Sequence, residues 1–226
     1  MKKILLAGCA VIALAACSRP VQPVSDTSAS ASSAPVPSID KIPAGDYKTD
    51  PMHSNLTFTV RHMGFSNYTA SFRRFDARLK LDPAQPEASS LSVEIDPNSL
   101  ELNAPPAGFH DEMTGKGFFD VGRFPKATFV STRVEKTGAN TAKVTGDFTL
   151  HGVTKPVVID VTFNGGYPGM AGYDPQARIG FSGHGTLKRS DFGISAGIPA
   201  PGTNMGVGDE VSFRIETEML GPPLKG

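Results

Sequence analysis

Val211-Ser212-Phe213-Arg214-Ile215-Glu216 decides the fold class of this chain, because apolar residues occupy its odd positions and polar residues its even positions. Side chains of a β-strand point alternately to the two faces of a sheet, so the pattern predicts a strand with one buried face. The same alternation recurs in residues 56–61, 91–95, 142–150 and 157–163. Such a series predicts an antiparallel sheet that hides its apolar face by closing into a barrel or by stacking in two layers.

Working outward from these segments gives about eight strands and little helix. A short first segment at residues 46–49 leads to eight expected strands at residues 56–63, 68–81, 90–95, 126–134, 141–150, 156–164, 178–187 and 210–219. The apolar parity slips at Arg73-Arg74, which predicts a β-bulge there. Glycines at 180, 183 and 185 in one strand indicate sharp curvature or space left beside the backbone. One helix is expected near residues 98–116.

The N-terminal part of the chain is predicted to be a targeting signal followed by a tether. Residues 1–16 combine two lysines with an apolar run too short to span a bilayer, as is typical of a secretory signal peptide. Leu14-Ala15-Ala16-Cys17 resembles a bacterial lipobox, so we expect lipidation at Cys17; an ordinary signal peptide with a chance cysteine is the alternative. The lipidated cysteine and the Pro-, Ala- and Ser-rich stretch after it, residues 17–45, are expected to form a disordered tether.

This organisation leaves residues 46–220 as one domain and residues 221–226 as a C-terminal tail. A lipid anchor at Cys17 predicts a protein of the cell envelope, held to the membrane on its periplasmic side. The residue after the cysteine is Ser18, which by resemblance to Gram-negative lipoproteins is compatible with sorting to the outer membrane.

Composition and motif spacing disfavour several classes of function. With 22 basic and 22 acidic residues, the chain suggests neither a nucleic acid nor an anionic membrane surface as a partner. The five histidines show no metal-ligand spacing, so no metal site is expected. Residues 193–197 match the Gly-x-Ser-x-Gly pattern of a nucleophile elbow, but Pro199 and Pro201 oppose the helix that must follow it. We expect no enzyme; a hydrolase built on Ser195 is the alternative.

Five motifs follow one another over nearly the whole domain. They are Tyr47-x-x-Asp50-Pro51-x-His53-Ser54-x-x-x-Phe58-x-Val60-x-His62-Met63-Gly64, Phe118-Phe119-Asp120 with Pro125 and Phe129, Gly146-Asp147-Phe148-Thr149-Leu150-His151-Gly152-Val153-Thr154-Lys155-Pro156, Arg189-x-Asp191-Phe192-Gly193, and Val207-Gly208-Asp209-Glu210-Val211. In this order they resemble the YceI-like family. The resemblance implies an all-β fold, an extended antiparallel eight-stranded lipocalin-like barrel with one short helix. It implies a polyisoprenoid or similar amphiphile carried in a tunnel, with homodimer formation left open. The lipobox departs from the many relatives that look like soluble secreted forms.

Phenylalanine dominates the face that the alternation turns inward. All 14 Phe follow the tether, and each methylene of a ligand buried among them would contribute about 0.8 kcal/mol. The Phe-rich face is compatible with a hydrophobic small-molecule partner. The family resemblance implies that this partner is an isoprenoid or quinone-like lipid, and no other cofactor is expected. The alternative from the residues alone is a dry core of packed Phe, and with it a structural or stress-related envelope module without cargo.

The residues predicted to line the tunnel are Phe58, Val60, Phe72, Val93, Ile95, Phe118, Phe119, Phe129, Phe148, Phe163, Phe181, Phe192 and Phe213. His62, Arg189 and Asp191 are the candidates for contact with a polar head. A pairing of Arg189 with Asp191 that holds the following loop is the structural alternative.

Overall fold

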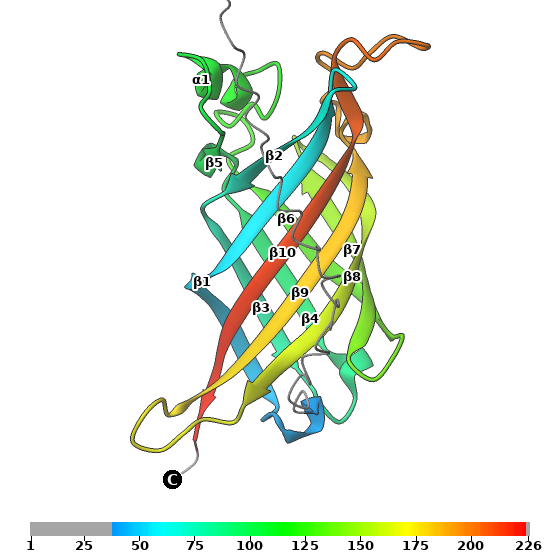
Figure 1. The fold of residues 1–226 in the computed structure, drawn as a ribbon. Helices are drawn as coiled ribbons and strands as arrows, with labels where there is room; N and C mark the ends of the chain where they lie inside the picture. Colours follow the sequence, from blue (N-terminus) through cyan, green and yellow to red (C-terminus); the bar gives the residue numbers. More distant parts are fainter. Residues whose placement is uncertain (1–37, 225–226) are drawn as a thin grey trace, which may run out of the picture. The chain divides into compact units, whose positions relative to one another are not determined.

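A computed structural model of the protein describes residues 38–224. Ten strands and one short α-helix make up the fold (Figure 1). The strands are β1 (Gly45–His62), β2 (Ser66–Phe72), β3 (Phe75–Leu81), β4 (Ser90–Ile95), β5 (Leu100–Glu101), β6 (Ala127–Lys136), β7 (Thr141–Leu150), β8 (Val153–Tyr167), β9 (Gln176–Lys188) and β10 (Val207–Pro223). The helices are α1 (Phe109–Thr114) and the short 3-10 turns η1 (Ile39–Lys41), η2 (Pro86–Ala88), η3 (Pro97–Ser99) and η4 (Arg189–Phe192). Within the described range, no helix is long and apolar enough to cross a membrane.

The strands close into an antiparallel barrel. Their order is β10-β9-β8-β7-β6-β4-β3-β1-β2-β5, and β10 pairs again with β1. Because the separate strands β2 and β3 pair with successive parts of β1, they share one position in the wall. The closed wall therefore has eight strand positions, and the two-residue β5 lies on β2. Closure pairs both edges of most wall strands, which lowers the aggregation hazard of a sheet, and leaves the edge of β2 away from β1 paired only at Ser71 and Phe72. The prediction of an all-β eight-stranded barrel with one short helix is confirmed.

The wall bends where the parity slips, although the prediction of a bulge within one continuous strand was wrong. Residues 73 and 74 separate β2 from β3, and the register of β1 against β10 shifts between Thr49 and Ser54. The buried hydroxyl of Thr49 accepts a hydrogen bond from the amide of Ala77 at 2.7 Å and donates to its carbonyl at 3.2 Å. This side chain therefore satisfies the backbone of β3 near the bend.

The helix is shorter than the 98–116 expected. Pro105 and Pro106 lack the amide protons that a helix needs, and Gly108, with φ of 78°, starts α1 from the left-handed region. Only Phe109–Thr114 is helical, while Leu100–Glu101 joins the sheet as β5.

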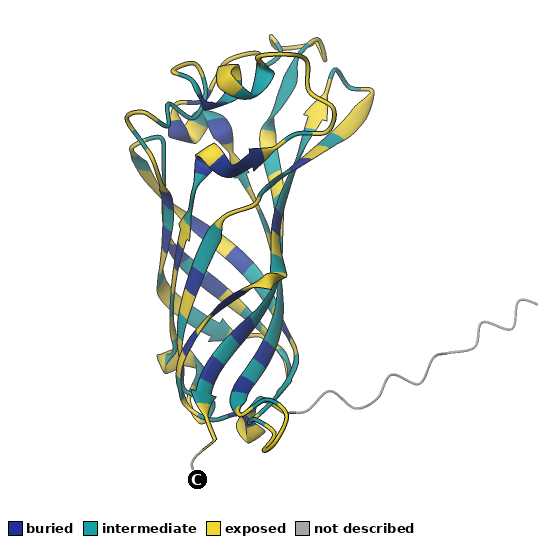
Figure 2. Cartoon of the chain, turned by 90° about the vertical axis from the view of Figure 1, so that its left-hand side faces the viewer, coloured by how far each residue is buried: buried dark blue, intermediate teal, exposed yellow. Residues whose placement is uncertain are grey.

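One half of the barrel interior is filled by the chain's own side chains. Tyr47, Phe163, Ile179 and Met219 lie there at 4% exposure or less, and Gly221 leaves room for the ring of Tyr47. Each fully buried side chain of this size contributes about 1.5–3 kcal/mol. We call this end, which also carries η1, the filled half, and the end near α1 the hollow half (Figure 1). Buried and exposed residues alternate along the strands of the wall (Figure 2).

Candidate ligand-binding site

The hollow half contains a cavity of about 640 Å³ with an almost entirely hydrocarbon wall. Its strand residues follow the parity expected from the sequence: even positions on β1 and odd positions on β10. The wall residues of these two strands are Leu56, Phe58, Val60 and His62 on β1 and Val207, Val211, Phe213 and Ile215 on β10. The volume lies within the range of ligand pockets, about 300–1,000 Å³.

A row of aromatic rings runs along one side of the cavity. Phe58 and Phe213 are direct partners across the β1–β10 seam that closes the barrel. Phe58 stacks on Phe72 with ring centroids 5.3 Å apart, and Phe72 meets Phe119 edge to face at 5.7 Å. These contacts lie on the cavity wall, so the rings pack against one another and still leave space beside them.

Glycines on β9 make room for one of these rings. A Cβ at Gly185 would lie 2.6 Å from the ring of Phe213 and 2.6 Å from the carbonyl oxygen of Val158. A Cβ at Gly183 would lie 3.2 Å from Ile159. The ring of Phe213 therefore lies against the bare backbone of β9, which is the space beside the backbone that the glycines indicated.

Residues 102–126, which we call the cap segment, cover the cavity where the strands of the wall do not pair. On its edge away from β1, β2 pairs only with β5, and β6 begins at Ala127. At one end of the cap segment the amide of Asn103 donates to the Tyr68 hydroxyl at 3.0 Å, and its side chain donates to the Thr69 carbonyl at 3.1 Å. At the other end the ring of Phe124 packs on His151, with centroids 4.9 Å apart. Leu102, Phe109, Met113, Phe118 and Phe119 of this segment line the cavity.

The cavity reaches the surface at one end of the barrel. Several lining residues there are also exposed, and we call them the mouth: His62, Asn103, Ala104, Pro105, Pro106, Ala196 and Gly197. They belong to the end of β1, the cap segment and the loop 193–206. His62 thus lies at the mouth, where a candidate for contact with a polar head is expected.

Nine of the predicted tunnel residues lie on the cavity wall, and four do not. The nine are Phe58, Val60, Phe72, Ile95, Phe118, Phe119, Phe129, Phe148 and Phe213. Val93 and Phe163 are buried in the packed core, and Phe181 packs on Phe163 with ring centroids 5.6 Å apart. Phe192 lies edge to face with Phe148 at 5.4 Å and is not itself on the wall.

The sequence interpretation missed several aliphatic wall residues, namely Leu56, Leu150, Val157, Ile159, Leu187, Ile194, Val211 and Ile215. The alternation along the strands assigns the strand members of this group to the inward face, just as it does the phenylalanines. Contact of any wall residue with a ligand stays a prediction.

Arg189 organises the loop at the mouth and does not pair with Asp191. Its buried guanidinium donates to four carbonyl oxygens, those of Gly208 at 2.9 Å, Ile194 at 3.1 Å, Ala196 at 2.7 Å and Val207 at 2.8 Å. Burial lowers its pKa. The structural alternative, a pairing of Arg189 with Asp191, was wrong, because Asp191 is exposed and makes no ion pair among the described residues.

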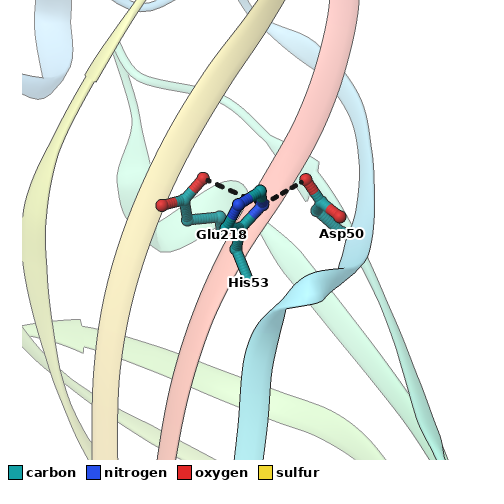
Figure 3. A group of neighbouring side chains, drawn as sticks. All are labelled: Asp50, His53 and Glu218. Atoms are coloured by element: carbon teal, nitrogen blue, oxygen red, sulfur yellow. Dashed lines mark hydrogen bonds and ion pairs between the residues drawn. The ribbon is translucent and has the colours of Figure 1, made fainter.

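A polar cluster on β1 and β10 has donor atoms close enough together for a metal, but its carboxylates already pair with the guanidinium of Arg178. Asp50, His53 and Glu218 point toward one another (Figure 3). Asp50 Oδ2 lies 2.9 Å from His53 Nδ1 and 2.6 Å from the guanidinium of Arg178, which also lies 3.2 Å from Glu218. Hydrogen bonds from His53 and then Arg178 lower the pKa of Asp50 to about 2. The Asp-Pro-x-His motif thus ties β1 to β9 and β10 beside the register shift.

Ser195 lies on an exposed loop after η4, without the strand, turn and helix of a nucleophile elbow. No hydrogen bond joins it to a histidine in the described part of the chain.

A family model described as a YceI-like domain matches residues 47–219. A UPF0312 protein of Pseudomonas savastanoi pv. phaseolicola is 43% identical over 173 residues, covering 75% of this chain and 85% of the relative. Among solved structures, BcnA of Burkholderia cenocepacia superposes with a TM-score of 0.62 at 28% identity, covering 75% of this chain and 98% of BcnA. A Saccharophagus degradans domain described as polyisoprenoid binding has a TM-score of 0.56 at 16% identity, covering 78% of this chain and 98% of that domain, a likeness of fold alone.

Proposed function

The chain belongs to the YceI-like family, and we propose that it binds a long-chain amphiphile, such as a polyisoprenoid or a quinone, in the cavity of its barrel. The observation that carries the proposal is the 640 Å³ cavity whose wall is almost entirely apolar. A packed module without cargo would have filled this half of the barrel as it fills the other. An apolar cavity of this size that opens at the surface suits an apolar guest better than water.

The size of the cavity suggests the length of the guest. If a methylene group takes up about the space of one water molecule, roughly 30 Å³, then 640 Å³ holds on the order of 20 such groups. At about 0.8 kcal/mol each, their burial gives a gross gain near 16 kcal/mol, from which ordering and association costs are subtracted. Chain length therefore dominates the affinity.

The polar head of the guest belongs at the mouth. The exposed residues His62 and Asn103 offer hydrogen-bonding groups there, whereas the guanidinium of Arg189 is engaged by four carbonyls. One hydrogen bond contributes about 1 kcal/mol, so the head sets the direction of the guest more than its affinity.

We assign the protein no catalytic step, so it acts as a carrier or as a store that sequesters its guest. Support comes from the cavity wall, which brings together hydrocarbon groups rather than a nucleophile and a base. The Leu14-Ala15-Ala16-Cys17 sequence supports attachment through a lipidated Cys17 on the periplasmic side of the cell envelope, at the outer membrane. Residues 1–37 lie outside the described part of the chain, so this assignment rests on sequence alone.

Extraction with organic solvent, followed by mass spectrometry, tests the proposal on protein purified from its native envelope without added lipid. We expect one class of long-chain amphiphile at a near-equal molar ratio to protein. A protein that yields none, and that binds no geranylgeraniol when the alcohol is added, would contradict the proposal. The lipid attached to Cys17 is covalent and survives extraction, which separates it from the guest.

A further inference from the structure

Two apolar tips project beside the mouth. Phe65 lies at the turn between β1 and β2 and is 81% exposed, and Met205 lies in the loop 193–206 and is 66% exposed. Both segments stand at the hollow end of the barrel (Figure 1). Single exposed apolar residues are ordinary on protein surfaces, but these two adjoin the rim of an apolar cavity.

The two tips are held together by backbone contacts. The amide of Met63 donates to the carbonyl of Gly206 at 2.7 Å, which joins the turn to the loop. The amide of Phe65 donates to the carbonyl of His62 at 2.9 Å across a turn whose central residues, Met63 and Gly64, have φ of 54° and 72°. This left-handed turn presents Phe65 outward, where the ring makes no contribution to the core.

A guanidinium accompanies the exposed ring. Arg61 donates to the carbonyl of Gly64 at 2.8 Å, which places its charge at the same turn as Phe65. In the described residues it makes no ion pair. Aromatic rings and basic side chains are enriched where proteins meet the boundary between lipid headgroups and acyl chains.

We propose that this end of the barrel docks on the surface of a phospholipid bilayer, with Phe65 and Met205 entering the headgroup region and Arg61 meeting a lipid phosphate. The inference rests on the proposed function, since a guest that dissolves in a bilayer can pass between bilayer and cavity without crossing water only if the mouth faces the membrane. The attraction comes from local apolar contact and not from the net charge of the chain, which is zero by formal count.

The filled end of the barrel provides the matched control. Tyr173 is 83% exposed and Met170 is 54% exposed in the loop between β8 and β9, so exposure there is similar to that of the tips. The apolar cavity does not open beside them, because Tyr173 and Met170 are absent from the residues that line it. If docking depends on the mouth, residues at the hollow end should contact the bilayer and those at the filled end should not.

The natural chain contains no Trp, so a single introduced Trp reports its own surroundings. We would place Phe65→Trp and, separately, Tyr173→Trp in the full-length chain and add phosphatidylcholine vesicles. We expect a blue shift of the Phe65→Trp emission and quenching by brominated acyl chains, with no change for Tyr173→Trp. An unchanged Phe65→Trp spectrum at saturating lipid, or an equal response of Tyr173→Trp, would overturn the proposal.

A second measurement follows the transfer of a fluorescent isoprenoid alcohol from the loaded protein to the same vesicles. The double variant Phe65→Ser with Met205→Ser should transfer about tenfold more slowly, while its uptake of the alcohol in solution is unchanged. Equal transfer rates for variant and natural chain would overturn docking. Failure of the natural chain to take up the alcohol, with the Phe65→Trp shift intact, would instead contradict the proposed function and support docking.

Discussion

Filling the cavity from its wall should lower affinity in proportion to the space lost. Val60 lines the cavity, faces Val211 across the seam and belongs to the inward parity of β1. Val60→Trp adds about seven non-hydrogen atoms. If each displaces one methylene-sized group of the guest at about 0.8 kcal/mol, the loss is about 5–6 kcal/mol. The guest can shift toward the mouth, so we expect at least about 2 kcal/mol, roughly 30-fold in Kd.

The assay is displacement of a fluorescent hydrophobic probe by geraniol, farnesol and geranylgeraniol. For the natural chain, affinity should rise at each step of the series, because each alcohol is longer by one isoprene unit. For Val60→Trp, geranylgeraniol should lose the most affinity and geraniol the least, because the shorter alcohol still fits the remaining space.

The matched control is Val158→Trp. Val158 is 41% exposed on the outer face of β8, next to the inward-facing Val157, so the same substitution leaves the cavity unchanged. Equal affinity of geranylgeraniol for Val60→Trp and the natural chain, with both variants folded by circular dichroism, would refute the assignment of the cavity as the binding site.

Three further predictions concern stability. The pKa of Asp50 is about 2 rather than 3.8, so its carboxylate stabilises the fold at neutral pH by about 2–3 kcal/mol. This contribution is lost as the pH falls from about 4 to about 2, and urea denaturation across this range should show the loss. In Asp50→Asn the free energy of unfolding should change less over the same pH range. Gly185→Ala should destabilise the fold by about 1–3 kcal/mol, since its Cβ would meet backbone and the ring of Phe213, and Gly183→Ala should destabilise it less; the reverse order would contradict the packing described. Arg189→Lys should destabilise the fold by about 2–4 kcal/mol, because an ammonium cannot bond four carbonyls in the guanidinium geometry, whereas Arg214→Lys on the outer face should be neutral in the same thermal denaturation.

Alternation in the sequence predicted which face a residue occupies but not its depth along the barrel. Phe213 and Phe163 both point inward, yet the first lines the cavity and the second packs in the core. Depth follows from the register between strands and from where glycines thin the wall, as Gly185 does beside Phe213. Neither quantity can be read from one strand alone, so the barrel was predictable and the border between its halves was not.

The alternation of apolar and polar residues also does not predict contacts between residues that are distant in sequence. Arg178 joins Asp50 across 128 positions, and no local spacing indicates this pair. Arg189 stood out as a motif residue, but its four carbonyl partners depend on the path of the loop 193–206. The Pro105-Pro106 pair, in contrast, could have limited the expected helix from the sequence alone.

The described chain enters the barrel through η1 and leaves it after β10, and both points lie at the filled end, away from α1 (Figure 1). A tether that joins the chain upstream of Ser38 is consequently attached at the filled end of the barrel, opposite the mouth. The attachment point therefore does not lie between the mouth and a bilayer on which the mouth docks. A sensor chip bearing the protein by either terminus would, for the same reason, leave the entrance unobstructed for incoming lipid.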